Sequence, residues 1–202
     1  MYRHFFKRLI DCTLSVLGLI VACIPMFIIA IAIKMESKGP VFFRQERLGK
    51  GFKHFKIFKF RTMCNGAFQK GGIATRSDDP RITKVGAFLR RTSLDEIPQM
   101  INILRGEMAI IGPRPILPFE FEEYKSNKRY AMRYEVLPGM ADYVSVVDRA
   151  ADRDLQFEMD AQYVEKIGFW FDLKLFFQLF MVVLSRKGVY REEVDEKMKM
   201  KK

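Results

Sequence analysis

Residues Leu9 to Ile33 form a nearly continuous apolar run, long enough to cross a bilayer as a helix. Asp11 and Pro25 are the exceptions. Lysine and arginine flank both ends of the run, whereas a spanning helix normally carries them on one side. A helix that enters the membrane, breaks at Pro25 and returns would place both flanks in the cytoplasm. The alternatives are a transmembrane anchor kinked at the proline and, less favoured because the run is too long, a cleaved signal peptide.

The rest of the chain has the composition of one compact domain. Of the 202 residues, 49% are hydrophobic and 29% are charged, which excludes a disordered chain and a membrane protein with many spans. We expect a membrane-embedded segment over residues 1–38, a cytoplasmic domain over residues 39–190 and a charged, disordered tail over residues 191–202. The net charge of +11 requires an acidic partner, for which nucleic acid, anionic lipid and a phosphate-bearing substrate all qualify.

Cysteine and histidine are too scarce to define a site. Three cysteines and two widely separated histidines give no disulfide framework, zinc spacing or Ser-His-Asp triad. A bound metal would therefore be a hard cation on oxygen ligands.

The elements predicted for the domain make it α+β and mainly helical. Residues 41–48 and 52–63 flank Gly49-Lys50-Gly51, which favours a β-hairpin. Along its second strand, alternation places Lys59 and Arg61 on one face with Phe55 and Ile57. That face is either a solvated basic strand or a cationic surface for lipid headgroups.

Several segments after the hairpin have weaker signals. Residues 64–75 are glycine-rich and predict a mobile loop, and the turn at residues 78–81 precedes a helix expected over residues 84–91. The two aspartates of that turn either cap it or supplement a metal site. A charged, aromatic helix is expected over residues 119–134. Residues 169–184 are apolar and aromatic but too short and polar to span, which fits an interfacial helix or, equally, a core helix.

Two adjacent acids stand at the centre of the chain. Ser93 precedes Glu96 by three residues and an apolar periodic run follows, so the pattern predicts a capping box that opens an amphipathic helix. The positive end of the helix dipole would favour the ionised form of Asp95, as a nucleophile or metal ligand. Pro98 implies that the first turn is bent or that regular helix begins only there.

Arginines stand on both sides of this pair of acids. Arg90 and Arg91 precede it, and Gly112-Pro113-Arg114-Pro115 fixes a third between two prolines. A guanidinium held this rigidly suits two-point recognition of a phosphate.

The motifs at residues 93–99, 104–108 and 112–115, in this order and spacing, resemble the core motifs of the bacterial sugar transferases, the small monotopic phosphoglycosyl transferases. The similarity extends from the apolar segment to about Val189. It implies a re-entrant helix that enters one leaflet, with break geometry altered because Ile24 stands where the family usually has serine before the proline. It also implies amphipathic helices at the interface and a location at the bacterial cytoplasmic (inner) membrane.

The resemblance also implies a reaction. Asp95 would attack the sugar-linked phosphate of a UDP-sugar, and polyprenyl phosphate would accept the phosphosugar after UMP leaves. Glu96 would hold Mg²⁺, while Arg90, Arg114 and Lys59 would contact phosphate. Membrane lipid is then a partner and nucleic acid is not. Residues 142–149 retain little of the family signature expected to shape the nucleotide-sugar pocket, for which Arg149 and Asp160 are the candidate ligands.

Two other functions remain compatible with the residues. A membrane-tethered binding protein with a basic face for anionic lipid or nucleic acid would explain the charge and the anchor, but not the two acids among basic residues. A lipid-linked glycosyltransferase would transfer sugar without phosphate and release UDP.

Overall fold

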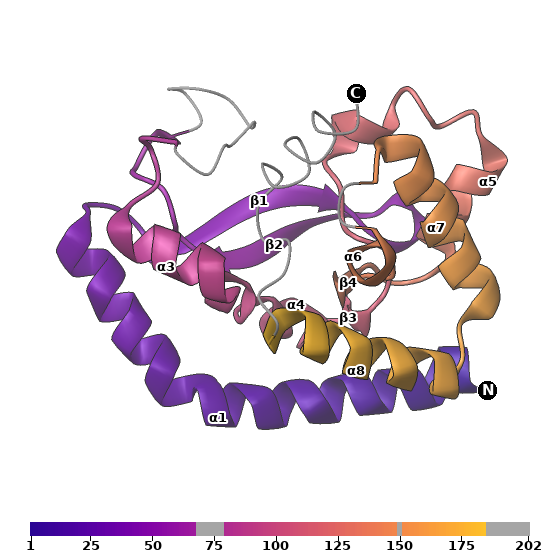
Figure 1. The fold of residues 1–202 in the computed structure, drawn as a ribbon, viewed down its shortest axis with the longest axis horizontal. Coiled ribbons are helices and arrows are strands. Elements are labelled where there is room, and N and C mark those ends of the chain that lie inside the picture. The colour runs from indigo at the N-terminus through magenta and orange to yellow at the C-terminus, as the bar shows by residue number, and fades with distance from the viewer. Residues whose placement is uncertain (68–78, 149–150, 185–202) are drawn as a thin grey trace, which may run out of the picture.

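The computed structural model describes residues 1–67, 79–148 and 151–184. Its elements confirm a mainly helical α+β fold with a hairpin. In chain order they are a π-helical turn at Tyr2–Phe6, α1 (Lys7–Glu36), β1 (Phe42–Leu48), β2 (His54–Phe60), α3 (Lys84–Thr92), α4 (Gln99–Leu104), β3 (Ala109–Ile111), α5 (Lys128–Ala131), β4 (Gly139–Ala141), α6 (Val144–Val147), α7 (Arg153–Lys166) and α8 (Phe169–Leu184) (Figure 1). The charged tail at 191–202 lies outside the described residues.

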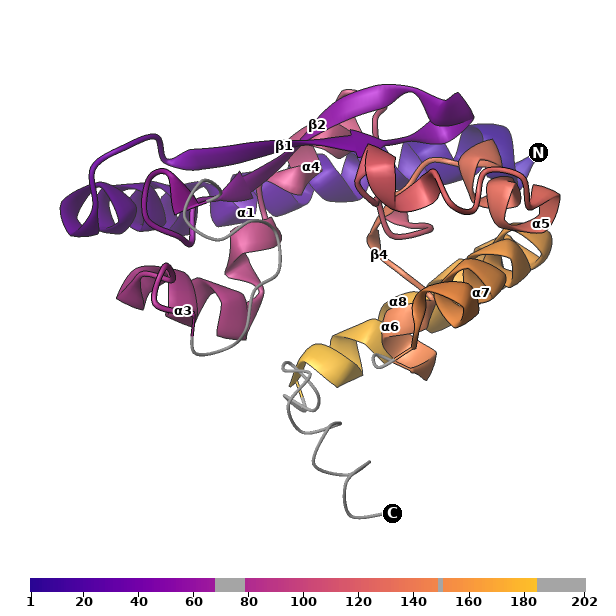
Figure 2. The same cartoon turned by 90° about the horizontal axis from the view of Figure 1, so that it is seen from above.

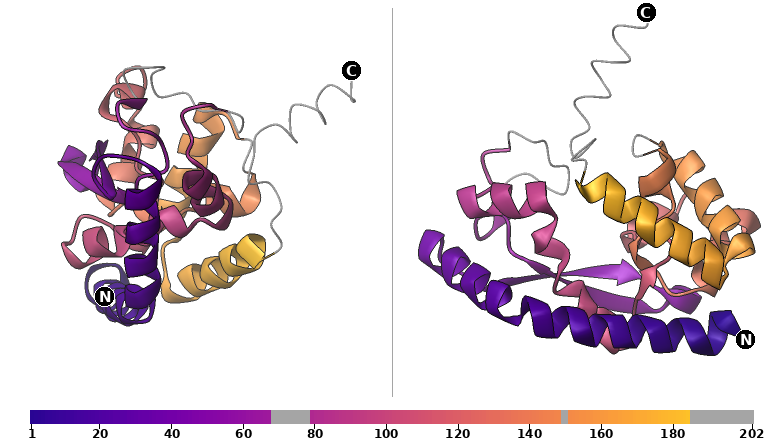
Figure 3. Two further views of the ribbon diagram at one scale, coloured as in Figure 1. Left: turned by 90° about the vertical axis from the view of Figure 1, so that its left-hand side faces the viewer. Right: turned by 60° about the horizontal axis from the view of Figure 1, so that its bottom comes forward.

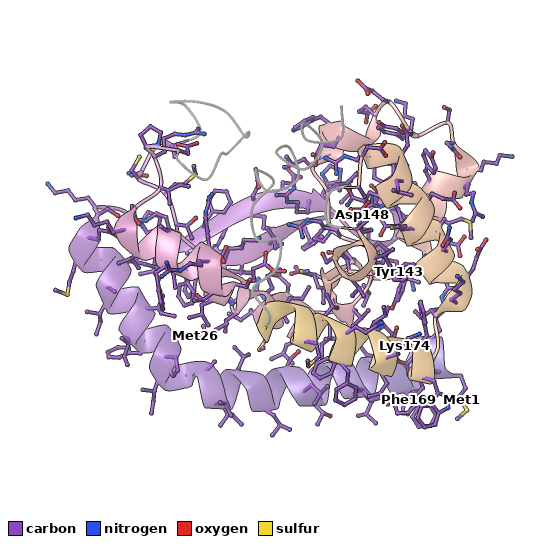
Figure 4. The ribbon with its side chains drawn as sticks, viewed as in Figure 1. Met1, Met26, Tyr143, Asp148, Phe169 and Lys174 are labelled. Carbon is purple, nitrogen blue, oxygen red and sulfur yellow. The ribbon has the colours of Figure 1, made fainter. Side chains whose placement is uncertain are left out.

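The apolar run forms α1, a single helix that stays helical through Pro25. The helix bends in that region, where Figure 4 labels Met26. Proline removes the hydrogen bond to the carbonyl of Val21, which accounts for a bend without a break. The chain does not leave the helix at Pro25, so the predicted break is a bend in this structure, and the re-entrant path through a membrane stays a prediction.

Most of α1 is not covered by the rest of the protein. It is the one helix in the described part of the chain that is long and apolar enough to cross a membrane, and only 11% of its most apolar window is buried. A core helix of a water-soluble protein would be mostly buried. The exposure of α1 therefore favours contact with lipid.

The C-terminal end of α1 is fixed by Arg61, which follows β2. Its guanidinium donates to the carbonyl oxygens of Lys38 at 2.7 Å and Ser37 at 2.8 Å, and the side chain is buried. Arg61 thus satisfies the carbonyls of the two residues that directly follow the helix. Both interpretations of this strand face, solvated or lipid-binding, are wrong for Arg61.

The hairpin prediction is confirmed by β1 and β2, which pair antiparallel from Phe42↔Phe60 to Leu48↔His54. Phe55 and Ile57 are buried against Ile103 and Met108, which lie in and just after α4. At the other end of the hairpin, Phe60 packs in a cluster formed by the end of α1 and by α3. The two strands therefore connect the membrane helix to the centre of the domain.

The helix expected over residues 84–91 is also confirmed, as α3. Thr83 caps it by accepting a hydrogen bond from the backbone N–H of Gly86 at 2.9 Å. A Cβ on Gly86 would lie 1.9 Å from the carbonyl oxygen of Thr62. Only glycine therefore allows α3 to approach the end of the hairpin this closely.

The helix expected over residues 119–134 is wrong. The chain there makes a 3₁₀ turn at Pro118–Phe121, then α5, then a second 3₁₀ turn at Met132–Glu135. Asn127 interrupts the helix because its side chain accepts hydrogen bonds from the next backbone N–H groups and starts α5 anew.

α7 and α8 complete the domain beside the short parallel pair of β3 and β4. α8 meets the beginning of α1, where the rings of Tyr2 and Phe169 lie 6.0 Å apart, and the two helices then diverge (Figure 2). Leu175 of α8 is buried, whereas Trp170, Phe177 and Met181 are exposed. α8 is thus not an enclosed core helix: like α1, it presents apolar side chains to the outside, and Figure 3 shows both helices along one side of the molecule.

Candidate active site

The two central acids lie in a 3₁₀ turn, Leu94–Glu96, between α3 and α4. Ser93 ends α3 in the left-handed conformation, with φ of 57°, and its side chain makes no capping hydrogen bond. The predicted capping box is therefore wrong, because Ser93 terminates one helix and does not open the next. α4 begins at Gln99, directly after Pro98, so the prediction that regular helix starts at the proline is confirmed.

Glu96 is paired with Lys59 of β2. The Lys59 Nζ lies 2.6 Å from Glu96 Oε1, and both side chains are partly buried. Burial alone would raise the pKa of Glu96, but Lys59 and Arg114 hold it below its usual value. Glu96 is thus an ionised carboxylate among cations.

Asp95 has the opposite electrostatic character. Burial raises its pKa to about 6, with Lys59 opposing the shift and Glu96 adding to it. The expectation that a helix dipole favours the ionised form is wrong here, because the acid sits in a short 3₁₀ turn and loses hydration. At neutral pH this carboxyl is still mainly ionised, and it is more basic than a solvated aspartate.

A solvent-open cleft of about 550 Å³ lies beside these acids. Among the described residues its lining carries four cationic and two acidic side chains and omits Asp95. The charged and polar members are Arg47, Lys59, Arg114, Arg153, Glu96, Glu120 and Gln99. The excess of cations makes the cleft suitable for a polyanionic ligand.

Arg114 is held from two directions. Its backbone carbonyl accepts a hydrogen bond from the Arg133 guanidinium, and its own Nη1 lies 3.5 Å from Asp142 Oδ2. Burial would lower the pKa of Arg114, but Asp142 and Glu96 raise it above its usual value. Its side chain is nonetheless 54% exposed, so a permanently charged guanidinium is fixed at its base and open at its tip.

Asp160 does not lie in the cleft. It is fully buried in α7, and its Oδ2 is 3.2 Å from Arg133 Nη2. No surface of the carboxylate is accessible in this geometry, so Asp160 does not reach the cleft directly, and its contact with a nucleotide sugar stays a prediction. It acts on the cleft through Arg133, which in turn holds the backbone of Arg114.

Of two further predicted site residues, Arg90 and Arg149, the structure describes only Arg90. Arg90, at the end of α3, donates from Nε to Thr62 Oγ1 at 2.9 Å and lowers the pKa of Asp95, so it lies close to the two acids. Arg149 lies outside the described residues, as does most of the predicted loop at 64–75.

Sequence reasoning missed Arg47, Gln99, Glu120 and Arg153. The predicted hairpin could have indicated Arg47. Arg47 pairs with Phe55 across the two strands, and cross-strand partners share a face of the sheet. That face also carries Lys59. Nothing local marks Arg153, which reaches the cleft only through the packing of α7.

Metal-ligating groups are sparse in this region. Among the described residues no three His, Cys, Asp or Glu side chains gather in one place. Asp79 bonds to Arg81 at 2.6 Å, which favours the turn-forming role of that segment over a metal site. Asp95 and Glu96 are consecutive acids next to the cleft, which suits a cation that takes its other ligands from phosphate and water.

A family model and several known proteins match nearly the whole chain. Residues 2–186 match the family described as "Bacterial sugar transferase". A UDP-glucose:undecaprenyl-phosphate glucose-1-phosphate transferase of Escherichia coli (strain K12) is 38% identical over 195 residues, covering 93% of this chain and 42% of the relative. A UDP-N-acetylgalactosamine-undecaprenyl-phosphate N-acetylgalactosaminephosphotransferase of Aeromonas hydrophila is 35% identical over 189 residues, covering 91% and 45%. An uncharacterized sugar transferase of Bacillus subtilis (strain 168) is 34% identical over 184 residues, covering 91% and 89%. The chain thus spans less than half the length of the first two relatives.

Proposed function

The chain belongs to the bacterial sugar transferase family, and we propose that it transfers a sugar-1-phosphate from a UDP-sugar to undecaprenyl phosphate at a membrane surface. The names of two relatives that cover over nine-tenths of the chain support the reaction class. The names differ in the sugar, which is glucose in one and N-acetylgalactosamine in the other. We therefore propose a UDP-sugar as the donor without naming the sugar.

In the proposed reaction the Asp95 carboxylate attacks the sugar-linked phosphorus. A phosphorus–oxygen bond forms to Asp95, the bond to the nucleotide's phosphate breaks, and UMP leaves with the bridging oxygen. An oxygen of undecaprenyl phosphate then attacks the same phosphorus and releases Asp95. The raised pKa of Asp95 supports this role, because the carboxylate is more basic than usual yet still ionised at neutral pH.

Three cations reduce the repulsion between this nucleophile and its anionic target. Lys59 is held beside Glu96, Arg114 reaches the cleft from its fixed base, and Arg90 lies near Asp95. Preorganised charges of this kind stabilise the transferring phosphoryl group without having to be reoriented during the step.

We assign Mg²⁺ to Glu96, with Asp95 adjacent and the remaining ligands from diphosphate and water. A donor set of one or two carboxylates plus substrate phosphates is the usual one for this ion. Bound there, Mg²⁺ would neutralise charge on the diphosphate. Because Lys59 already pairs with Glu96, the carboxylate would have to serve both cations.

The exposed apolar helices provide the place where the two substrates meet. In the proposal α1 enters one leaflet of the bacterial inner membrane, turns back at its bend near Pro25 and leaves the domain on the cytoplasmic face. α8 lies in the interface with Trp170 in the headgroup layer. A water-soluble donor and a lipid acceptor then reach one cleft, and their encounter no longer depends on free diffusion of both.

The observation that carries the proposal is the cleft in which Lys59, Glu96 and Arg114 converge next to Asp95. We expect the full chain in detergent or vesicles to release UMP from one of a panel of UDP-sugars when undecaprenyl phosphate and Mg²⁺ are present. Release of UDP would instead indicate transfer of sugar without phosphate.

The Asp95→Asn variant tests the intermediate. It should lose turnover and also lose covalent labelling by a donor that carries radioactive phosphate in the sugar-linked position. The Glu122→Gln variant is a matched control, because Glu122 is an exposed acid paired with Lys125 outside the cleft. Full turnover in Asp95→Asn would remove Asp95 from the nucleophilic role.

A further inference from the structure

Glu120 holds a second cationic group in the cleft, separate from the Lys59–Glu96 pair. Arg153 Nη2 pairs with Glu120 Oε1, and Arg47 Nη1 lies 3.9 Å from Glu120 Oε2. Both arginines and Glu120 line the same cleft as Lys59 and Arg114. The two arginines come from β1 and α7, 106 positions apart in the chain.

Arg47, Arg153 and Glu120 together carry a net positive charge, since Glu120 is the one acid that contacts the two arginines among the described residues. Arg114, which shares the cleft, has its own partner in Asp142. Arg47 is mostly buried, and its Nε has no hydrogen-bond partner in the described part of the chain. Burial lowers the pKa of Arg47, and repulsion from Arg114 and Arg153 lowers it further. Such repulsion is relieved when an anion enters.

The arginines are also held in place before any ligand arrives. Glu120 accepts a hydrogen bond from the backbone N–H of Leu117 at 2.7 Å, so its carboxylate is fixed by its own turn. Arg153 donates from Nη1 to Gln156 Oε1 at 2.9 Å, and its guanidinium lies over the ring of Phe157. Groups ordered in advance lose less entropy on binding.

We propose that Arg47 and Arg153 form a second anion subsite that binds the nucleotide-side phosphate of a diphosphate donor, the phosphate that departs as UMP. Arg114 lines the same cleft and interacts electrostatically with both Arg47 of this subsite and Glu96 of the Lys59–Glu96 pair. Glu120 holds the two arginines through its ion pairs until the phosphate competes for them. The identity of the ligand rests on the proposed function.

The lining of the cleft favours a water-soluble ligand over a lipid phosphate for this subsite. Among the residues that the structure describes, none from α1 or α8 contributes to the lining. A polyprenyl chain requires apolar surface continuous with its phosphate, and these two helices carry that surface. A nucleoside phosphate requires none.

The experiment measures UMP affinity by titration calorimetry on the full chain in detergent. Arg47→Gln and Arg153→Gln should each weaken UMP binding about tenfold or more, the effect of losing one charge-assisted hydrogen bond. Arg153→Lys keeps the positive charge and should retain most of the affinity for UMP. This variant therefore separates the effect of a lost charge from the effect of altered packing. Arg129→Gln is the matched control, since Arg129 is an arginine of α5 paired with Glu158 outside the cleft, and it should leave the affinity unchanged.

Two further probes separate the sources of the anion. Inorganic pyrophosphate should lose affinity in both glutamine variants, whereas farnesyl phosphate should not. Loss of farnesyl phosphate binding with UMP affinity intact would overturn the assignment to the nucleotide side, and intact UMP affinity in both folded variants would overturn the subsite itself. If no UDP-sugar supports turnover but both variants weaken UMP and pyrophosphate, the proposed function fails and the subsite stands.

Discussion

The membrane helix is joined to the domain by a buried carboxylate, and breaking this joint should cost several kilocalories per mole. Asp172 of α8 is 2.7 Å from Lys7 Nζ and 2.7 Å from the Tyr2 hydroxyl, while the Tyr163 hydroxyl lies 2.9 Å from its other oxygen. Lys7 and Asp172 are 10% and 7% exposed at their side chains. Lys7→Met would leave a buried charge with only neutral donors, at a cost of about 3–5 kcal/mol.

A double-mutant cycle isolates this pair. Asp172→Asn keeps an acceptor for the two tyrosines but leaves the Lys7 ammonium with only Asp11, 4.0 Å away, so alone it should also destabilise. The combination Lys7→Met/Asp172→Asn removes both charges and should recover more than half of the summed loss. Lys125→Met is the matched control, because Lys125 is 2.7 Å from Glu122 but 66% exposed, and its loss should change stability by no more than about 1 kcal/mol.

The free energy of unfolding can be followed by urea titration in mild detergent, with thermal melting as a second readout. For a chain of this size 3–5 kcal/mol corresponds to a decrease in Tm of about 6–20 °C. Additive losses in the double variant, or a Lys7→Met variant as stable as the control, would refute the reasoning that the pair couples α1 to α8.

Three other outcomes follow from the structure. Gly112→Ala should reduce turnover and lower stability by about 1–3 kcal/mol, because its Cβ would lie 2.5 Å from the carbonyl oxygen of Leu137 and displace the loop that carries Arg114; unchanged kinetics would contradict this. Burial raises the pKa of Asp160 to about 7, above its ordinary 3.8, with Arg133 opposing the shift, so the native state binds this proton more tightly than the unfolded chain. The contribution of Asp160 to the free energy of unfolding should therefore rise as pH falls from about 7 to about 4, and the difference between wild type and Asp160→Asn should change in the same sense in a pH series of urea titrations. Trp170 is the single tryptophan and is 78% exposed, so vesicles should shift its fluorescence to the blue and brominated lipids should quench it; an emission spectrum indifferent to vesicles would place α8 outside the interface.

The elements that sequence predicts correctly depend on local patterns. The apolar run gives α1, the glycine-centred turn gives the hairpin, and Pro98 gives the start of α4. The capping box predicted at Ser93 is wrong because this residue lies at the end of α3 and at the start of the next turn. Ser93 adopts the left-handed conformation that ends α3, and its side chain does not cap the next turn. Periodicity cannot show this, since it treats each helix alone.

The site was predictable only in part, for a related reason. Lys59, Glu96 and Arg114 carry motif signals, and the structure does bring them to one cleft. Arg153 has no such signal, because its place in the cleft depends on how α7 packs. The complete burial of Asp160 could not be predicted either, because burial is a property of the whole fold. Charge type can be read from a sequence, but accessibility cannot.

The path from α1 to Arg114, the arginine proposed to bind phosphate, is short and continuously bonded. Asp11 of α1 accepts a hydrogen bond from the backbone N–H of Ile110 at 3.3 Å, and the Tyr163 hydroxyl lies 3.0 Å from the carbonyl oxygen of Ile111. The next residue, Gly112, donates to Ala141 at 3.0 Å, so β3 is fixed on both sides directly before the loop of Arg114. Three residues therefore separate the contact with α1 from the base of that guanidinium. Because hydrogen bonds fix this strand on both sides, the proposed function predicts that the depth of α1 in a bilayer would set the height of the cleft above it. A lipid acceptor anchored in the same leaflet would then meet the cleft at a fixed distance.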